Sequence, residues 1–134
     1  MRRGVLVIAF GAMAAVSSAC GGKSTPAAGG SAPCSPNGVI LHVAAKNTAF
    51  DTTCLAAPDN TRFQIVFDNQ DAGTPHTVSI YTNSSATTAL FRGESVEGPA
   101  MRTYDVNALK AGAYYFRCDI HPTQMNGRFV VSGG

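Results

Sequence analysis

The feature that most restricts how this chain can fold is a series of short segments whose apolar residues follow the period of a β-strand. Successive side chains of a strand point to opposite faces, so such segments bury one face against another layer. Turn sequences with Gly, Pro, Asn and Asp separate them. The segments are residues 39–45, 62–69, 76–81, 102–106, 113–118 and 127–131.

Helical spacing is weak throughout the sequence. The nearest candidate is residues 84–91, which we expect to form a short helical turn or an irregular excursion. Short strands joined by turns in a domain of about a hundred residues predict an all-β fold, a Greek-key antiparallel β-sandwich. Folds of this class host many functions, so function has to be inferred from particular residues.

The N-terminal segment has the pattern of an export signal. Arg2 and Arg3 form a basic start, and residues 4–16 are an apolar run of thirteen residues. A transmembrane helix needs about 20 such residues, so residues 1–19 are predicted to be a signal peptide outside the folded domain. The small residues that end on Cys20 resemble a bacterial lipoprotein box, in which the cysteine is acylated and becomes the first mature residue. An ordinary secretory signal that contains a cysteine is the alternative.

The next segment, residues 20–36, is rich in Gly, Pro, Ser and Ala and carries a single charged side chain. This composition buries too little apolar surface to order itself, so we expect a flexible linker, lipidated at Cys20. Residues 37–134 then form a single domain, large enough for one hydrophobic core.

The formal net charge of +2 comes from the N-terminal segment. Without Arg2 and Arg3, the ten Lys and Arg residues become eight, which equals the eight Asp and Glu residues. A mature chain without net charge has no basic footprint for nucleic acid and no strong field to steer a charged partner.

The four cysteines have different expected roles. Exported proteins meet an oxidising compartment, in which thiols tend to pair. If Cys20 carries lipid, Cys34 and Cys54 are a natural pair, and their disulfide would stabilise the fold by about 3 kcal/mol in the chain-entropy model. Cys118 is then left over. An odd cysteine in an exported domain indicates an intermolecular bridge, a reactive thiol or a metal ligand.

Strand alternation places Cys118 at the edge of the core. Tyr114, Phe116 and Cys118 share one face of the predicted strand, and two of them are aromatic. Cys118 should therefore lie at the inward-facing end of this strand, where the chain enters the loop of residues 119–126. Another strand follows the loop directly, so we expect sheet to hold the loop at both ends.

Residues near this cysteine complete a set of copper ligands. One thiolate, two imidazoles and a weak, distant thioether suit a copper ion that cycles between Cu(I) and Cu(II). The loop after Cys118 contains His121 and Met125, and His76 opens a predicted strand about forty residues earlier. These four residues are the predicted ligands of one copper ion, with Met125 in the axial position. Gln124 is the alternative axial ligand.

A cysteine beside a histidine also occurs in nucleophilic catalysis, and Cys118 and His121 are close enough in sequence to touch. No orienting acid is identifiable, and the thiol lies beside core aromatic residues, so we expect that the protein is not an enzyme. The third histidine, His42, is in the middle of the first predicted strand, where a structural or solvent-facing role is expected.

The stretch "GAYYFRCDIHPTQM" resembles the ligand loop of the cupredoxins, the type 1 or blue copper proteins such as plastocyanin and amicyanin. Upstream, "FDNQDAGTPHTVSIY" is similar to the family segment in which an Asn-rich turn leads to the first ligand histidine. The resemblance implies equatorial ligands His76, Cys118 and His121 and axial ligand Met125. This sequence differs from the family pattern at Thr77, where many members have an Asn that bonds toward the cysteine loop. Because the loop has one cysteine, the copper site should be mononuclear.

Four protein ligands leave no position for a substrate, so the resemblance implies outer-sphere electron transfer. We expect a monomer that carries single electrons between redox partner proteins and docks through the surface around His121 and Pro122. The export signal and Cys20 would anchor it by lipid at the outer face of the cytoplasmic membrane. The alternative is a copper-binding lipoprotein that buffers or delivers copper.

Overall fold

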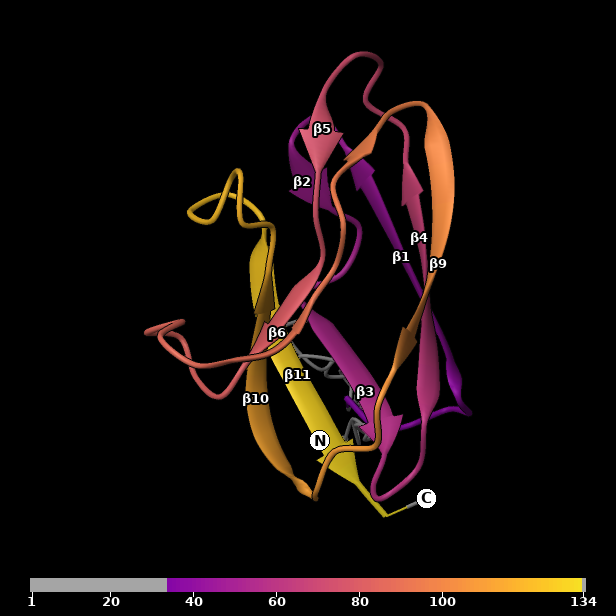
Figure 1. Cartoon of the computed structure of the whole chain (residues 1–134), viewed down its shortest axis with the longest axis vertical. Coiled ribbons are helices and arrows are strands. Elements are labelled where there is room, and N and C mark those ends of the chain that lie inside the picture. Colours follow the sequence, from indigo (N-terminus) through magenta and orange to yellow (C-terminus); the bar gives the residue numbers. More distant parts are fainter. Residues whose placement is uncertain (1–33, 134) are drawn as a thin grey trace, which may run out of the picture. The chain divides into compact units, whose positions relative to one another are not determined.

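The computed structural model describes residues 34–133. Every regular element in this range is a β-strand (Figure 1). They form a four-stranded sheet, a five-stranded sheet and a two-stranded ribbon. The prediction of an all-β sandwich is therefore confirmed. The strands are β1 (Ile40–Lys46), β2 (Ala49–Phe50), β3 (Cys54–Pro58), β4 (Phe63–Asn69), β5 (Pro75–His76), β6 (Ser79–Tyr81), β7 (Ala89–Arg92), β8 (Val96–Glu97), β9 (Ala100–Val106), β10 (Gly112–Arg117) and β11 (Asn126–Ser132).

The two large sheets are mixed rather than purely antiparallel. The four-stranded sheet has the order β2-β1-β4-β9, the five-stranded sheet has the order β3-β11-β10-β6-β7, and β5 pairs with β8. Most neighbours are antiparallel, as predicted, but β1 pairs with β4 and β3 pairs with β11 in parallel. The chain thus crosses from β1 to β3 in the other sheet before it returns as β4. Alternation has the same period in both kinds of pairing, so it cannot reveal this difference.

Alternate residues of the strands fill the space between the two large sheets. In β4, Phe63, Ile65 and Phe67 are at most 2% exposed, and the residues between them are half-buried. From the other sheet, Phe116 and Phe129 are fully buried, and the rings of Phe63 and Phe129 lie 5.6 Å apart. Burial of each such side chain stabilises the fold by about 1.5–3 kcal/mol. This packing fixes the strand ends from which the candidate site is built.

Most predicted strands agree with observed ones to within a few residues, and the differences have local causes. Residues 76–81 were predicted as one strand but contain β5 and β6, with a break between them. Residues 84 and 85 form a single turn, in which the Ala86 amide donates to the Asn83 carbonyl at 3.0 Å, and the chain is then irregular until β7 begins. The predicted strands do not include β3 or the short strands β2, β7 and β8. In β3, "CLAAP" has none of the β-branched or aromatic residues that are enriched in strands.

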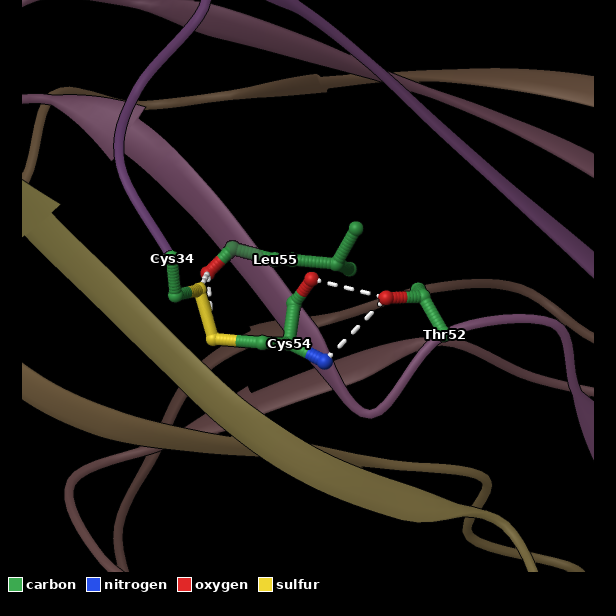
Figure 2. The surroundings of a disulfide bond; sticks show 4 residues. All are labelled: Cys34, Thr52, Cys54 and Leu55. Carbon is green, nitrogen blue, oxygen red and sulfur yellow. Dashed lines mark hydrogen bonds between the residues drawn. A yellow bond between two sulfur atoms is a disulfide. The ribbon is translucent and has the colours of Figure 1, made fainter. Parts of the chain in front are cut away.

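A disulfide joins Cys34 to Cys54 at the start of β3 (Figure 2). The two residues are 20 positions apart, and this is the pair that the cysteine count favoured. Figure 2 also shows the Thr52 hydroxyl, which donates to the Cys54 carbonyl at 2.9 Å and accepts from the Cys54 amide at 3.2 Å. The first described residue is thus tied covalently to the five-stranded sheet.

The predicted signal peptide, the lipidation site Cys20 and the linker up to residue 33 lie outside the described residues. No helix in residues 34–133 is long and apolar enough to cross a membrane.

Candidate metal centre

Strand ends bring the four predicted ligands to one region of the sandwich. His76 is the last residue of β5, Cys118 follows β10 directly, and Met125 directly precedes β11. His121 lies in the loop between β10 and β11, which is the yellow loop in the upper half of Figure 1, the same half as β5. Because β10 pairs with both β6 and β11, the sheet holds this loop at both ends, as predicted.

Three donor atoms form a compact triangle. The Nδ1 atoms of His76 and His121 are 3.1 Å apart, and Cys118 Sγ is 3.9 Å from each of them. Within residues 34–133, these residues are the only group of three or more His, Cys or acidic residues with ligating atoms this close together. His42 is exposed on β1 and is not a member of the group.

The triangle has the size that one metal ion requires. Metal bonds to imidazole nitrogen and thiolate sulfur are about 2.0–2.3 Å long. Two such bonds that meet at one ion at roughly 100–130° end about 3–4 Å apart. The observed separations lie in this range, so the three residues fit a metal ion without movement of the backbone. Two nitrogens and one sulfur around a single point are the equatorial set that suits copper.

The loop closes on itself so that Met125 lies beside the cysteine. The Met125 amide donates to the His121 carbonyl at 3.0 Å, and the Met125 carbonyl accepts from the Cys118 amide at 2.8 Å. The Met125 side chain is fully buried. Gln124, the alternative axial ligand, is exposed, and its side-chain oxygen accepts from the Thr123 hydroxyl. Burial therefore favours Met125 over Gln124 as the fourth donor.

Asp71 fixes the orientation of the first histidine. Its Oδ2 lies 2.8 Å from His76 Nε2, and the His76 side chain is fully buried. Since a carboxylate only accepts, Nε2 carries the proton and donates it, which leaves the Nδ1 lone pair directed toward Cys118 and His121. Hydrogen bonds from the Thr48 amide and from the His76 ring hold the pKa of the Asp71 carboxyl below its usual value. Nδ1 is thus the nitrogen of His76 that is available to bind a metal ion.

Asn69, the last residue of β4, shapes the turn that carries Asp71. This side chain is fully buried, and its amide group donates to the carbonyls of Thr74 and Val96 at 2.8 and 2.7 Å. Its carbonyl oxygen accepts from the Asp71 amide at 3.0 Å. Every polar atom of the Asn69 side chain is therefore used, and the path from β4 to β5 is defined by hydrogen bonds.

Thr77 joins the two segments that supply the ligands. Its amide points at Cys118 Sγ over 3.4 Å, and its hydroxyl accepts from the Asp119 amide at 2.7 Å. Thr77 thus bonds to the cysteine loop from the position where many cupredoxins are expected to have an Asn with that contact. An amide directed at a thiolate stabilises its negative charge, so this contact also acts on the donor strength of the sulfur.

Asp119, directly after the cysteine, anchors the start of the loop. Its carboxylate accepts from the Tyr81 hydroxyl at 2.6 Å, from the Ser79 hydroxyl at 2.7 Å and from Arg117 Nε at 2.8 Å. Burial opposes ionisation of Asp119, but the bonds from Tyr81, Ser79 and Arg117 outweigh it and hold the pKa of this carboxyl below its usual value. The residue that follows Cys118 is therefore fixed by its side chain as well as by its amide.

The ligands differ in their exposure. His76, Cys118 and Met125 are fully buried, whereas His121 is half-buried. Next to His121 in the chain, Ile120 is 44% exposed and Pro122 is half-buried. His121 is thus the candidate ligand that reaches the surface, and its neighbours there are apolar.

The sequence prediction of the site does not include Asp71 or Asn69. The available signal for Asp71 was an acidic residue five positions before a predicted ligand histidine, in the same turn, since ligand histidines commonly donate their second nitrogen to a carboxylate. For Asn69 the signal was an amide at the end of a strand that faces the core, a position where every polar atom must be satisfied.

A family model described as a cupredoxin-like domain matches residues 6–131. The chain belongs to this family. The predicted resemblance is confirmed at the level of family and fold. A search of curated proteins found no significant match to the sequence.

Solved structures of the same fold include two auracyanins and an amicyanin. Auracyanin from Roseiflexus castenholzii matches the cupredoxin chain with a TM-score of 0.64 and 17% identity, over 72% of this chain and 98% of its own. Auracyanin A from Chloroflexus aurantiacus, described as a blue copper protein, has a TM-score of 0.62 and 20% identity, over 69% and 98%. Amicyanin from Paracoccus versutus has a TM-score of 0.51 and 23% identity, over 69% and 80%.

Proposed function

We propose that this cupredoxin is a mononuclear type 1 copper protein that carries single electrons between redox partner proteins. The observation that carries the proposal is the triangle of His76 Nδ1, His121 Nδ1 and Cys118 Sγ, with Met125 buried at the end of the same loop. The fold neighbours support it, because auracyanin A is described as a blue copper protein and one amicyanin structure as a reduced Cu(I) form.

Copper held by these residues would supply a one-electron Cu(I)/Cu(II) couple. The chain itself supplies donors that are already in place, since sheet and hydrogen bonds fix both ligand segments. Donors that keep their positions when copper changes between Cu(I) and Cu(II) lower the reorganisation energy of electron transfer. Four protein donors leave no position for a substrate, so we propose a carrier without catalytic activity of its own.

The surface around His121 is the proposed docking site for redox partners. His121 reaches solvent between Ile120 and Pro122, and the mature chain is expected to have no net charge. A protein with little net charge gains little from long-range steering, so we propose that partners dock by apolar contact at this surface and that the carrier is a monomer.

We also propose that the protein is exported and held by a lipid on Cys20 at the outer face of the cytoplasmic membrane. The support is the sequence of the N-terminal segment, with its basic start, apolar run and small residues before the cysteine. Metabolic labelling with a radioactive fatty acid tests this: wild type should take up label, and Cys20→Ser should not. Equal labelling of both proteins would refute lipidation at this residue.

The decisive experiment on function is addition of Cu(II) to the purified protein. We expect an intense blue absorption band and a narrow copper hyperfine splitting in electron paramagnetic resonance, both lost in Cys118→Ser and both kept in Cys34→Ser/Cys54→Ser. Reversible bleaching by a reductant should follow. A colourless protein that retains only Cu(I) would overturn electron transfer and favour the alternative of copper buffering or delivery.

A further inference from the structure

We propose that Asp71 is a positioning residue that selects the ligating nitrogen of His76 and sets the preference of the site for Cu(II) over Cu(I). This inference rests on the proposed copper function. Asp71 lies outside the loop between β10 and β11 and is not itself a predicted ligand, and its proposed effect is on the relative affinities of the site for Cu(II) and Cu(I).

Asp71 contacts His76 directly. Asp71 Oδ2 accepts the Nε2–H of His76 at 2.8 Å, and the imidazole ring is fully buried. A buried neutral imidazole has one donor and one acceptor nitrogen, and which is which depends on its partners. With Nε2 as donor, Nδ1 is the free acceptor, and Nδ1 is the atom that lies 3.1 Å from His121 Nδ1.

Asp71 also has hydrogen-bond partners other than the histidine. Its Oδ1 accepts from the Asn47 amide, and its Oδ2 accepts from the Thr48 amide at 2.8 Å. Asn47 and Thr48 have left-handed backbone angles, with φ of 54° and 57°, and form the turn between β1 and β2. Successive amides in such a turn converge on one anion. The carboxylate is therefore held by the turn independently of its contact with His76.

The Asp71 side chain is only 13% exposed, so its negative charge is partly shielded from water. A carboxylate on the far nitrogen of a ligand histidine makes the near nitrogen a stronger donor. A stronger donor favours the more highly charged Cu(II), so the carboxylate should lower the reduction potential of the site. Loss of such a partner typically weakens metal binding by about 10–100-fold.

Two variants and a matched control separate these effects. Asp71→Asn keeps an oxygen that can accept from His76 but removes the charge, and Asp71→Ala removes both. Asp51→Asn is the control, because Asp51 also accepts a backbone amide in the same hairpin, from Ala44 at 2.9 Å, and it is exposed. Cu(II) and Cu(I) affinities are measured for each full-length protein with competing chelators, and potentials by spectroelectrochemistry.

We expect Asp71→Asn to weaken Cu(II) binding by about 10-fold or more and Cu(I) binding by less. Each tenfold change in the ratio of the two affinities raises the potential of a one-electron couple by about 59 mV. Asp71→Ala should have the larger effect, and Asp51→Asn should stay within about twofold of wild type. Asp71 variants that match the Asp51→Asn control, or whose potential falls, would overturn the inference.

The metal-free protein provides an independent measurement. In nitrogen-15 correlation spectra of the wild type, the His76 ring should carry its proton on Nε2 alone, and in Asp71→Ala both tautomers should be populated. A wild-type ring protonated on Nδ1 would overturn the positioning role whether or not copper binds. A wild type that has the Nε2 proton but never becomes blue refutes the proposed type 1 copper function while it upholds the selection of the nitrogen.

Discussion

The Thr77 amide lies 3.4 Å from the Cys118 sulfur, although the two residues are 41 positions apart in the chain. The contact forms where β5 ends, so the amide faces the thiol and not a neighbouring strand. The hydroxyl of the same threonine accepts from the Asp119 amide at 2.7 Å. Thr77 thus ties the segment of His76 to both Cys118 and the residue after it.

We predict that Thr77→Val destabilises the metal-free protein by about 1–3 kcal/mol, because the Asp119 amide loses its acceptor in a partly buried position. Valine has nearly the same shape as threonine, so the loss is of a hydrogen bond and not of packing. The measurement is urea-induced unfolding. Thr77→Ser is the control that keeps the hydroxyl, and equal stabilities of the valine and serine variants would contradict the prediction.

The cysteine loop was the most predictable part of the site. Alternation in residues 113–118 placed Phe116 and Cys118 on the buried face, and both are fully buried. The loop is short, and two paired strands enclose it. The spacing of Cys118, His121 and Met125 in the sequence is therefore enough to predict that they lie close together. The sequence pattern predicts the structure well in this region because the two strands that enclose the loop are consecutive in the chain and pair with each other.

The support of His76 was not predictable in the same way. Asp71 contacts this histidine because a turn at Asn47 and Thr48, more than twenty positions away, holds the carboxylate. That turn is adjacent to the histidine segment because β1 and β4 pair in parallel, and a parallel pairing leaves no distinct sign in the alternation of either strand. Contacts that depend on strand order require the fold itself.

Gly127 provides a prediction about the strand after the ligand loop. A Cβ atom at this position would clash with the Thr53 carbonyl oxygen and would lie 2.6 Å from Phe116 Cε1. We therefore expect Gly127→Ala to destabilise the protein by about 1–3 kcal/mol through overpacking and to weaken metal binding, since Met125 is two positions away. The measurements are thermal unfolding and copper titration. Gly133→Ala is the control, because nothing lies within 4 Å of a Cβ there, and a Gly127→Ala protein as stable as that control would refute the clash.

The disulfide should matter for stability and not for the metal. Replacement of both Cys34 and Cys54 by serine removes a covalent link across 20 positions. In the chain-entropy model this lowers the free energy of unfolding by about 3 kcal/mol, which denaturant titration measures. The blue absorption should be unchanged, because Cys118 is the cysteine that belongs to the donor group. Loss of colour at full copper loading would show that the pair takes part in the site.

Tyr81 should stabilise the start of the ligand loop through its hydroxyl. This residue is fully buried and donates to the Asp119 carboxylate at 2.6 Å. A hydrogen bond to a charged group contributes about 1.5–3 kcal/mol, so we expect Tyr81→Phe to lower stability by that amount and to raise the pKa of Asp119. Carbon-13 spectra of the carboxyl group measure the second effect. Tyr114→Phe is the matched control, since the Tyr114 hydroxyl bonds to the Lys110 carbonyl at an exposed position. Equal losses in the two variants would argue against a special role for the Tyr81–Asp119 bond.

Removal of copper should lower the thermal stability of the protein. The donor triangle exists only in the folded chain, where strand ends bring His76 to Cys118 and His121, so a metal bound there stabilises the folded state alone. At a free copper concentration of 100 times the dissociation constant the gain is about 2.7 kcal/mol, and at 1,000 times it is about 4.1 kcal/mol. Differential scanning calorimetry with and without a chelator should therefore show a melting temperature that rises with copper concentration. Cys118→Ser should lose most of this dependence, whereas Cys34→Ser/Cys54→Ser should keep it from a lower starting temperature. A melting temperature that rises equally in wild type and in Cys118→Ser would place the bound copper elsewhere on the protein.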